Sequence, residues 1–137
     1  MARRILVVDD EEDHAASLRD LFERLLPGEP RVDMANDPEQ ARALLRDQAY
    51  DLVISDEGMP GGSGTDLLRW FHERRPAVPK VLMSAYPEES IGRAALRAAG
   101  VKLFLLKPFD QADMLRQVER LLAEPPRNGD ATAPSSN

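Results

Sequence analysis

The alternation of five short apolar runs with segments of helical periodicity limits the fold more than any other feature of the sequence. Ile5-Leu6-Val7-Val8 is one continuous apolar run, which is typical of a strand buried on both faces, whereas residues 31–34 form a weaker strand pattern. Between them, apolar residues recur at spacings of three and four, as in Leu18, Leu21, Phe22 and Leu25. Strands that alternate with helices predict a parallel sheet with right-handed crossovers. We therefore expect an α/β fold, a doubly wound sheet of five parallel strands with five helices. The expected strands are residues 4–8, 31–34, 51–55, 79–83 and 102–106.

Helix boundaries and a change of composition define the domain. Asp37-Pro38 has the residue types of a helix start, residues 88–99 are expected to form one helix, and Gly100 is expected to end it in the left-handed conformation. From Pro125 the chain is rich in Pro, Asn, Gly, Ala and Ser, which cannot supply a buried core. The sequence predicts one domain over residues 1–124 and a disordered tail or linker over 125–137.

Charge and residue usage exclude several classes of function. The 137-residue chain carries 24 acidic and 18 basic residues, a net charge of -6, so its own field repels nucleic acid. It has no cysteine and two histidines, which excludes disulfide and thiolate chemistry and disfavours a structural zinc site. No apolar stretch has the length of a transmembrane helix, and acids directly follow the short apolar run at the N-terminus. We expect a cytoplasmic protein that contacts neither membrane nor nucleic acid directly.

Polar residues follow four of the predicted strands at their carboxyl ends. Asp9 and Asp10 follow the first strand, Asp56 the third, Ser84 the fourth and Lys107 the fifth. In parallel sheets these ends share one edge, which is where ligands bind. We therefore expect three carboxylates, a hydroxyl and an ammonium to converge.

Three neighbouring carboxylates predict a divalent cation. At an effective dielectric constant of about 20, two unit charges roughly 4 Å apart repel by about 4 kcal/mol, and Lys107 alone cannot neutralise Asp9, Asp10 and Asp56. An all-oxygen site with few protein ligands suits Mg²⁺, or Mn²⁺. Capping of the following helix is the simpler explanation for Asp9 and Asp10 taken alone, but Asp56 and Lys107 opposite them favour the metal site.

The same groups predict phosphoryl transfer. A carboxylate can attack phosphorus and form an acyl phosphate, and Asp56 is central among the strand ends. Such a transfer needs alignment and neutralisation of the equatorial oxygens, which the cation, Lys107 and the Ser84 hydroxyl could provide.

Together these motifs resemble the response-regulator receiver family of two-component signalling systems, over about residues 3–122. The ordered set is far more specific than any one motif. The matching segments are Val7–Glu11, Asp56–Pro60, Ser63-Gly64, Ser84-Ala85 and Phe104–Phe109.

The resemblance implies a fold and a ligand set. The fold is flavodoxin-like, with strand order 2-1-3-4-5. Asp10 binds the metal directly, Asp9 acts largely through water, and the phosphorylated residue Asp56 and the carbonyl of Gly58 complete the protein ligands.

The resemblance also implies a switch and a partner. Lys107-Pro108 is a cis peptide, and Ser84 and Phe104 rearrange on phosphorylation. The phosphoryl donor is a sensor histidine kinase or a histidine phosphotransfer protein, and the response controls an output domain or partner. Such a domain is a signalling module, not an enzyme that turns over a separate substrate.

Two other functions fit the sequence less well than phosphoryl acceptance. A degenerate receiver that only binds a partner is disfavoured because all five key positions are present. A flavin-binding protein is disfavoured because acids follow the first strand, where a flavin phosphate needs hydroxyls and amides. We assign no role to Glu57, whose side chain is expected to point away from Asp56, and we interpret His14 and His72 as plain surface residues.

Overall fold

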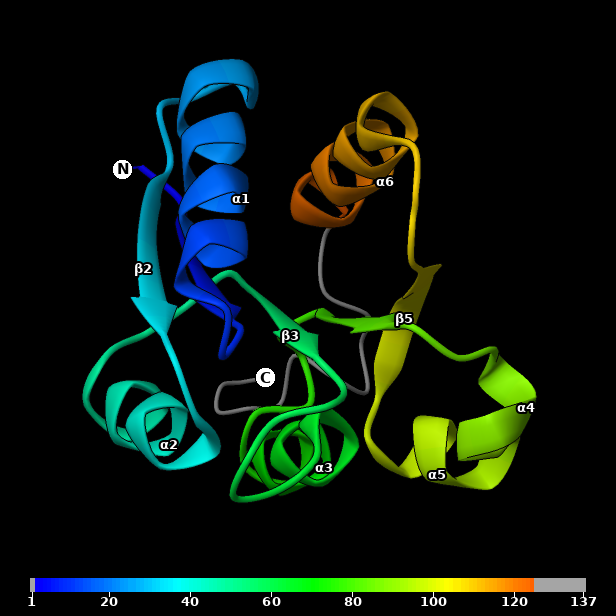
Figure 1. The fold of residues 1–137 in the computed structure, drawn as a ribbon. Helices are drawn as coiled ribbons and strands as arrows, with labels where there is room; N and C mark the ends of the chain where they lie inside the picture. Colours follow the sequence, from blue (N-terminus) through cyan, green and yellow to red (C-terminus); the bar gives the residue numbers. More distant parts are fainter. Residues whose placement is uncertain (1, 125–137) are drawn as a thin grey trace.

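The computed structural model describes residues 2–124, which form a five-stranded parallel sheet in the order β2-β1-β3-β4-β5 (Figure 1). Every neighbouring pair of strands is parallel, so the predicted sheet and its strand order are confirmed. The strands are β1 (Arg4–Val8), β2 (Arg31–Ala35), β3 (Leu52–Asp56), β4 (Lys80–Ser84) and β5 (Val101–Leu106).

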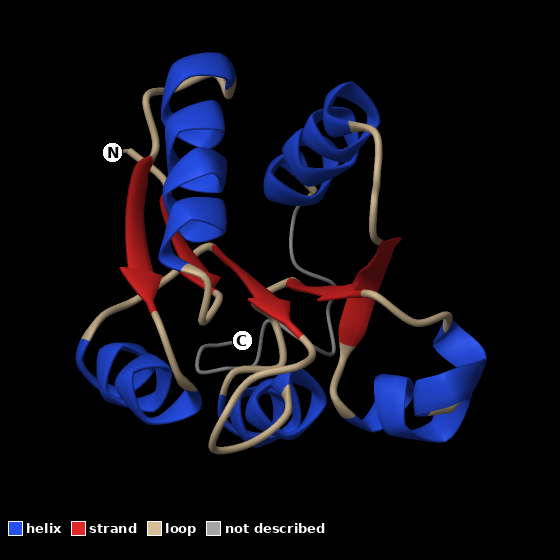
Figure 2. Cartoon of the chain, in the orientation of Figure 1, coloured by secondary structure: helices blue, strands red, loops and turns tan. Residues whose placement is uncertain are grey.

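Within residues 2–124, six helices connect and cover the strands, one more than predicted (Figure 2). The segment expected to be one helix over residues 88–99 is two short helices, because Gly92 adopts a φ of 101°, which no helix accommodates. Gly100 has the expected positive φ, 69°. The helices are α1 (Glu12–Leu25), α2 (Pro38–Asp47), α3 (Gly64–Arg74), α4 (Glu88–Ile91), α5 (Arg93–Ala98) and α6 (Gln111–Ala123).

Alternation along each strand divides the core into two layers. Ile5 and Val7 of β1 pack with α1 and α6 on one face of the sheet, whereas Leu6 and Val8 pack with α2, α3 and α5 on the other (Figure 1). All four side chains are fully buried. Burial on both faces explains why the β1 segment is continuously apolar from Ile5 to Val8.

Strand register brings the polar strand ends together. Val8 pairs with Ser55, so Asp9 and Asp56 leave adjacent strands side by side. On the other side of β3 the pairing continues to β4 and β5, and the backbone N–H of Lys107 donates to the carbonyl of Ser84 at 2.8 Å. The predicted convergence at the carboxyl edge is therefore a consequence of the sheet itself.

A buried lysine lies in the core layer beneath α3. The Lys80 side chain is fully buried, and its Nζ lies 2.5 Å from the carbonyl oxygen of Arg75 and 2.9 Å from Nδ1 of His72. The prediction that His72 is a plain surface residue is therefore wrong.

Two sequence expectations concern the chain ends and membranes. The disordered tail expected over residues 125–137 lies outside the described residues. Among residues 2–124, no helix has both the length and the hydrophobicity needed to cross a bilayer.

Candidate functional site

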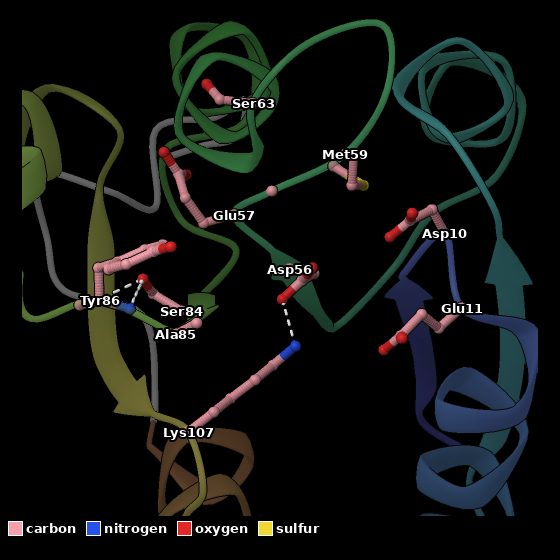
Figure 3. A pocket seen from close by; sticks show the side chains of 11 residues that line it. Asp10, Glu11, Asp56, Glu57, Met59, Ser63, Ser84, Ala85, Tyr86 and Lys107 are labelled. Atoms are coloured by element: carbon pink, nitrogen blue, oxygen red, sulfur yellow. Dashed lines mark hydrogen bonds and ion pairs between the residues drawn. The ribbon is translucent and has the colours of Figure 1, made fainter.

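An open cavity of about 590 Å³ lies at the carboxyl edge of the sheet (Figure 3). Five predicted site residues line it directly: Asp10, Asp56, Gly58, Ser84 and Lys107. They lie at or just after the carboxyl ends of β1, β3, β4 and β5, and Figure 3 shows the Lys107 side chain extending toward Asp56. The structure thus brings together residues that are up to about a hundred positions apart in sequence.

Three carboxylates lie close together at this edge of the sheet. One carboxylate oxygen each of Asp9, Asp10 and Asp56 lie within 4.8 Å of one another. Asp9 is fully buried and Asp56 is 8% exposed, so water screens their repulsion poorly. The donor set is all oxygen and one acid is open to solvent, which fits a hard divalent cation that keeps several waters.

Asp56 also forms an ion pair with Lys107. Lys107 Nζ lies 2.6 Å from Asp56 Oδ1. Burial nevertheless raises the pKa of Asp56 above its ordinary value; Lys107 opposes this effect, and the charges of Asp9 and Asp10 add to it. One ammonium therefore does not offset the burial and crowding of negative charge, and a cation has a physical reason to bind.

The Ser84 hydroxyl is directed toward its own loop. It donates to the carbonyl of Tyr86 at 2.7 Å and accepts from the Tyr86 N–H at 2.9 Å (Figure 3). Ser84 is only 1% exposed, so these bonds hold it in a protected position. To reach a phosphoryl group on Asp56, the hydroxyl must exchange these partners, and its predicted role stays a prediction.

Gly58 and Phe104 occupy positions compatible with their predicted roles. Gly58 lines the cavity and is an exposed residue. Phe104 is half-buried against the core layer under α3 and α5. Metal binding by Gly58 and switching by Phe104 stay predictions.

Glu57 has a structural contact that the sequence analysis missed. Its side chain points away from Asp56, as predicted, and Oε1 accepts from the backbone N–H of Thr65 at 2.8 Å and from its hydroxyl at 2.6 Å. The carboxylate therefore satisfies a free N–H in the first turn of α3 and ties that helix to the acceptor loop.

His14 also contradicts its predicted role as a plain surface residue. Its Nδ1 is hydrogen-bonded to Oδ2 of Asp9, the buried acid of the site. The sequence contains a signal for this contact, because Asp9 directly follows β1 and His14 lies in the first turn of the next helix, yet the direction of the side chain depends on packing.

Comparison with known proteins decides the family. The family model for the response regulator receiver domain matches residues 5–119. The chain belongs to this family of signalling domains. The relatives include the hydrogenase transcriptional regulatory protein HoxA of Cupriavidus necator, 31% identical over 92% of this chain, and the response regulator PilR of Pseudomonas aeruginosa, 36% identical over 79%.

These receiver-family relatives differ greatly in length. This chain spans about a quarter of the length of its first relatives, 25% of HoxA and 23% of PilR. In contrast, it covers 92% of an uncharacterised 14.6 kDa protein of Leptolyngbya boryana, which is 35% identical to it.

Solved structures agree on the receiver fold. The signal receiver domain of an HD domain-containing protein from Pseudomonas fluorescens covers 88% of this chain, and the match covers 87% of that domain, with a TM-score of 0.79 and 28% identity. The response regulator TrrA of Thermotoga maritima, in complex with Mg²⁺ and BeF, covers 87% of this chain and is matched over 98% of its own length, with a TM-score of 0.76 and 27% identity.

Proposed function

We propose that this receiver domain accepts a phosphoryl group on Asp56 in a reaction that requires Mg²⁺ or Mn²⁺. The observation that carries the proposal is the position of the Asp56 carboxylate, which lies 2.6 Å from Lys107 and within a three-acid cluster. An acidic cluster around a nucleophile suits catalysis only when a cation occupies it, and the oxygen ligands present suit that cation. Asp10, Asp56 and the carbonyl of Gly58 are the proposed direct ligands, and Asp9 is proposed to act largely through water.

The chemistry assigns a task to each residue. An Asp56 oxygen forms a bond to phosphorus while the bond from phosphorus to the donor atom breaks, and the donor leaves with that electron pair. Lys107 neutralises an equatorial oxygen of the transferring group, and the Ser84 hydroxyl binds another after it leaves the Tyr86 backbone. Bound Mg²⁺ supplies charge neutralisation and alignment.

The proposed donor is a sensor histidine kinase or a histidine phosphotransfer protein, and the proposed response is a switch. Movement of Ser84 toward the phosphoryl group leaves space that Phe104, half-buried on neighbouring β5, can fill by a rotamer change. Transcriptional control, which the name of HoxA records for that relative, would need an output outside this domain. A cytoplasmic location, and a domain comprising residues 1–124, belong to the same proposal.

The proposal is tested by phosphate incorporation from acetyl phosphate. With millimolar Mg²⁺, intact-mass spectrometry is expected to show the addition of one phosphoryl group, and with EDTA it is expected to show none. Equal phosphate incorporation with Mg²⁺ and with EDTA would contradict the metal requirement. No phosphate incorporation under either condition would favour a receiver that only binds a partner.

Mg²⁺ alone is expected to stabilise the domain against heat. A ligand that binds only the folded state stabilises it by about 2.7 kcal/mol at a hundredfold excess over its Kd. Asp10→Ala should remove most of this effect because it removes an exposed, proposed direct ligand. A thermal melt of the variant that responds to Mg²⁺ as strongly as wild type would contradict the role of Asp10.

A further inference from the structure

Asp9 is held by two donors on the helix that follows it. Its Oδ1 accepts from the backbone N–H of Glu11 at 3.0 Å, and its Oδ2 is hydrogen-bonded to Nδ1 of His14. Asp9 is fully buried, whereas the His14 side chain is 31% exposed. One oxygen is thus fixed by the backbone and the other by a replaceable side chain.

The direction of the side-chain bond follows from the chemistry of the pair. A carboxylate that binds a cation is ionised and can only accept hydrogen bonds. Nδ1 of His14 must therefore carry the hydrogen and donate it to Oδ2 of Asp9. One carboxylate oxygen of Asp9 also lies within 4.8 Å of one oxygen each of Asp10 and Asp56.

We propose that His14 is a positioning residue for the cation site, which it serves by holding the carboxylate of Asp9. The inference rests on the proposed function, since it concerns the same Mg²⁺. Partners that orient a metal-binding group raise metal affinity, and their loss typically costs roughly 10–100-fold. Without His14, Asp9 can rotate about its side-chain bonds, and binding the cation then costs the entropy of ordering it.

Direct ligation is the competing role for His14. One ligand atom each of Asp9, Glu11 and His14 also lie within 4.8 Å of one another, beside an opening lined by Glu11, His14 and Lys107. Imidazole is a better ligand for Mn²⁺ than for Mg²⁺, so the two roles differ in their dependence on the metal. Positioning predicts equal losses for both ions, because the altered ligand is a carboxylate in each case.

The experiment compares two variants of the full chain by isothermal titration calorimetry with Mg²⁺ and with Mn²⁺. His14→Leu keeps the volume but cannot donate, and it is expected to raise the Kd of both ions by roughly tenfold. His14→Asn places an amide N–H near the position of Nδ1 and is expected to recover most of the affinity. The metal-free melting temperature of both variants, measured in EDTA, should stay near that of wild type, because the side chain is partly exposed.

Each outcome separates the inference from the function on which it rests. If wild type binds Mg²⁺ and Asp10→Ala does not, but His14→Leu binds as wild type, the positioning role fails and the proposed function stands. Tighter binding by His14→Leu would show that His14 competes with the cation, and a loss confined to Mn²⁺ would show direct ligation; either result overturns positioning. Equal binding by wild type and Asp10→Ala would overturn the proposed metal site itself.

Discussion

Asp56→Asn is expected to abolish phosphate incorporation from acetyl phosphate, with no mass increase detectable after treatment in Mg²⁺. The amide has nearly the same shape as the carboxylate, but its oxygen is a poor nucleophile and cannot form an acyl phosphate. The backbone that places it belongs to β3, which is paired on both sides, so the fold does not depend on the charge.

An exposed acid outside the cavity provides the matched control. Asp66 lies in the first turn of α3 and is exposed, so Asp66→Asn removes one negative charge without touching the cluster. It should be phosphorylated as wild type is. A mass increase that persists in Asp56→Asn would show that another residue accepts the phosphoryl group.

The Asp56→Asn variant should also be more stable than wild type when Mg²⁺ is absent. The folded-state pKa of Asp56 is raised, chiefly by burial, so between its unfolded and folded pKa values the folded state binds more protons. The stability of wild type therefore falls as pH rises through that window, and asparagine removes the penalty. A gain of about 1 kcal/mol corresponds to roughly 2–8 °C in melting temperature for domains near this size.

Melting curves in EDTA from about pH 4 to pH 8 measure both effects. The difference between Asp56→Asn and wild type should grow with pH. A variant that melts well below wild type at neutral pH would show that the bond to Lys107 outweighs the burial of the carboxylate.

Strands β1, β3 and β4 could be predicted because they are buried on both faces and are therefore largely apolar. The site could be predicted for a related reason: a parallel sheet places the ends of its strands at one edge, so residues such as Asp56 and Lys107 need no further information to meet. The division of the helix at Gly92 was missed because glycine is tolerated inside helices, and only its φ of 101° reveals the break.

Side-chain pairings were the part that the sequence could not predict. Whether His14 faces solvent or Asp9 depends on a rotamer and on the start of α1, neither of which has a periodic signal. Lys80 was expected in a strand, but the burial of its side chain depends on His72 in α3 and on Arg75 in the loop that follows α3. The bonds of Ser84 to Tyr86 likewise depend on loop conformation.

Gly64→Ala is expected to damage both the fold and the phosphorylation site. A methyl group at this position would overlap the carbonyl oxygen of Asp56 and would lie 2.9 Å from Oγ of Ser55. Both atoms belong to buried β3 and cannot retreat, so α3 must shift away from the strand that carries the acceptor. The hydrogen bond from the Gly64 N–H to the carbonyl of Glu57, now 2.9 Å, would be stretched. Overpacking of this kind costs about 1–3 kcal/mol.

Gly58→Ala is the matched control, because a methyl group there meets no atom within 4 Å. It should change the free energy of unfolding by less than about 0.5 kcal/mol and should leave the carbonyl at this position accessible. Urea unfolding measures the first effect, and the initial rate of phosphate incorporation measures the second. Because α3 and the acceptor loop share the contact at Gly64, the Gly64→Ala variant should lose rate as well as stability, even where it is still folded. A Gly64→Ala protein that matches Gly58→Ala in both measurements would show that α3 can move without moving Asp56.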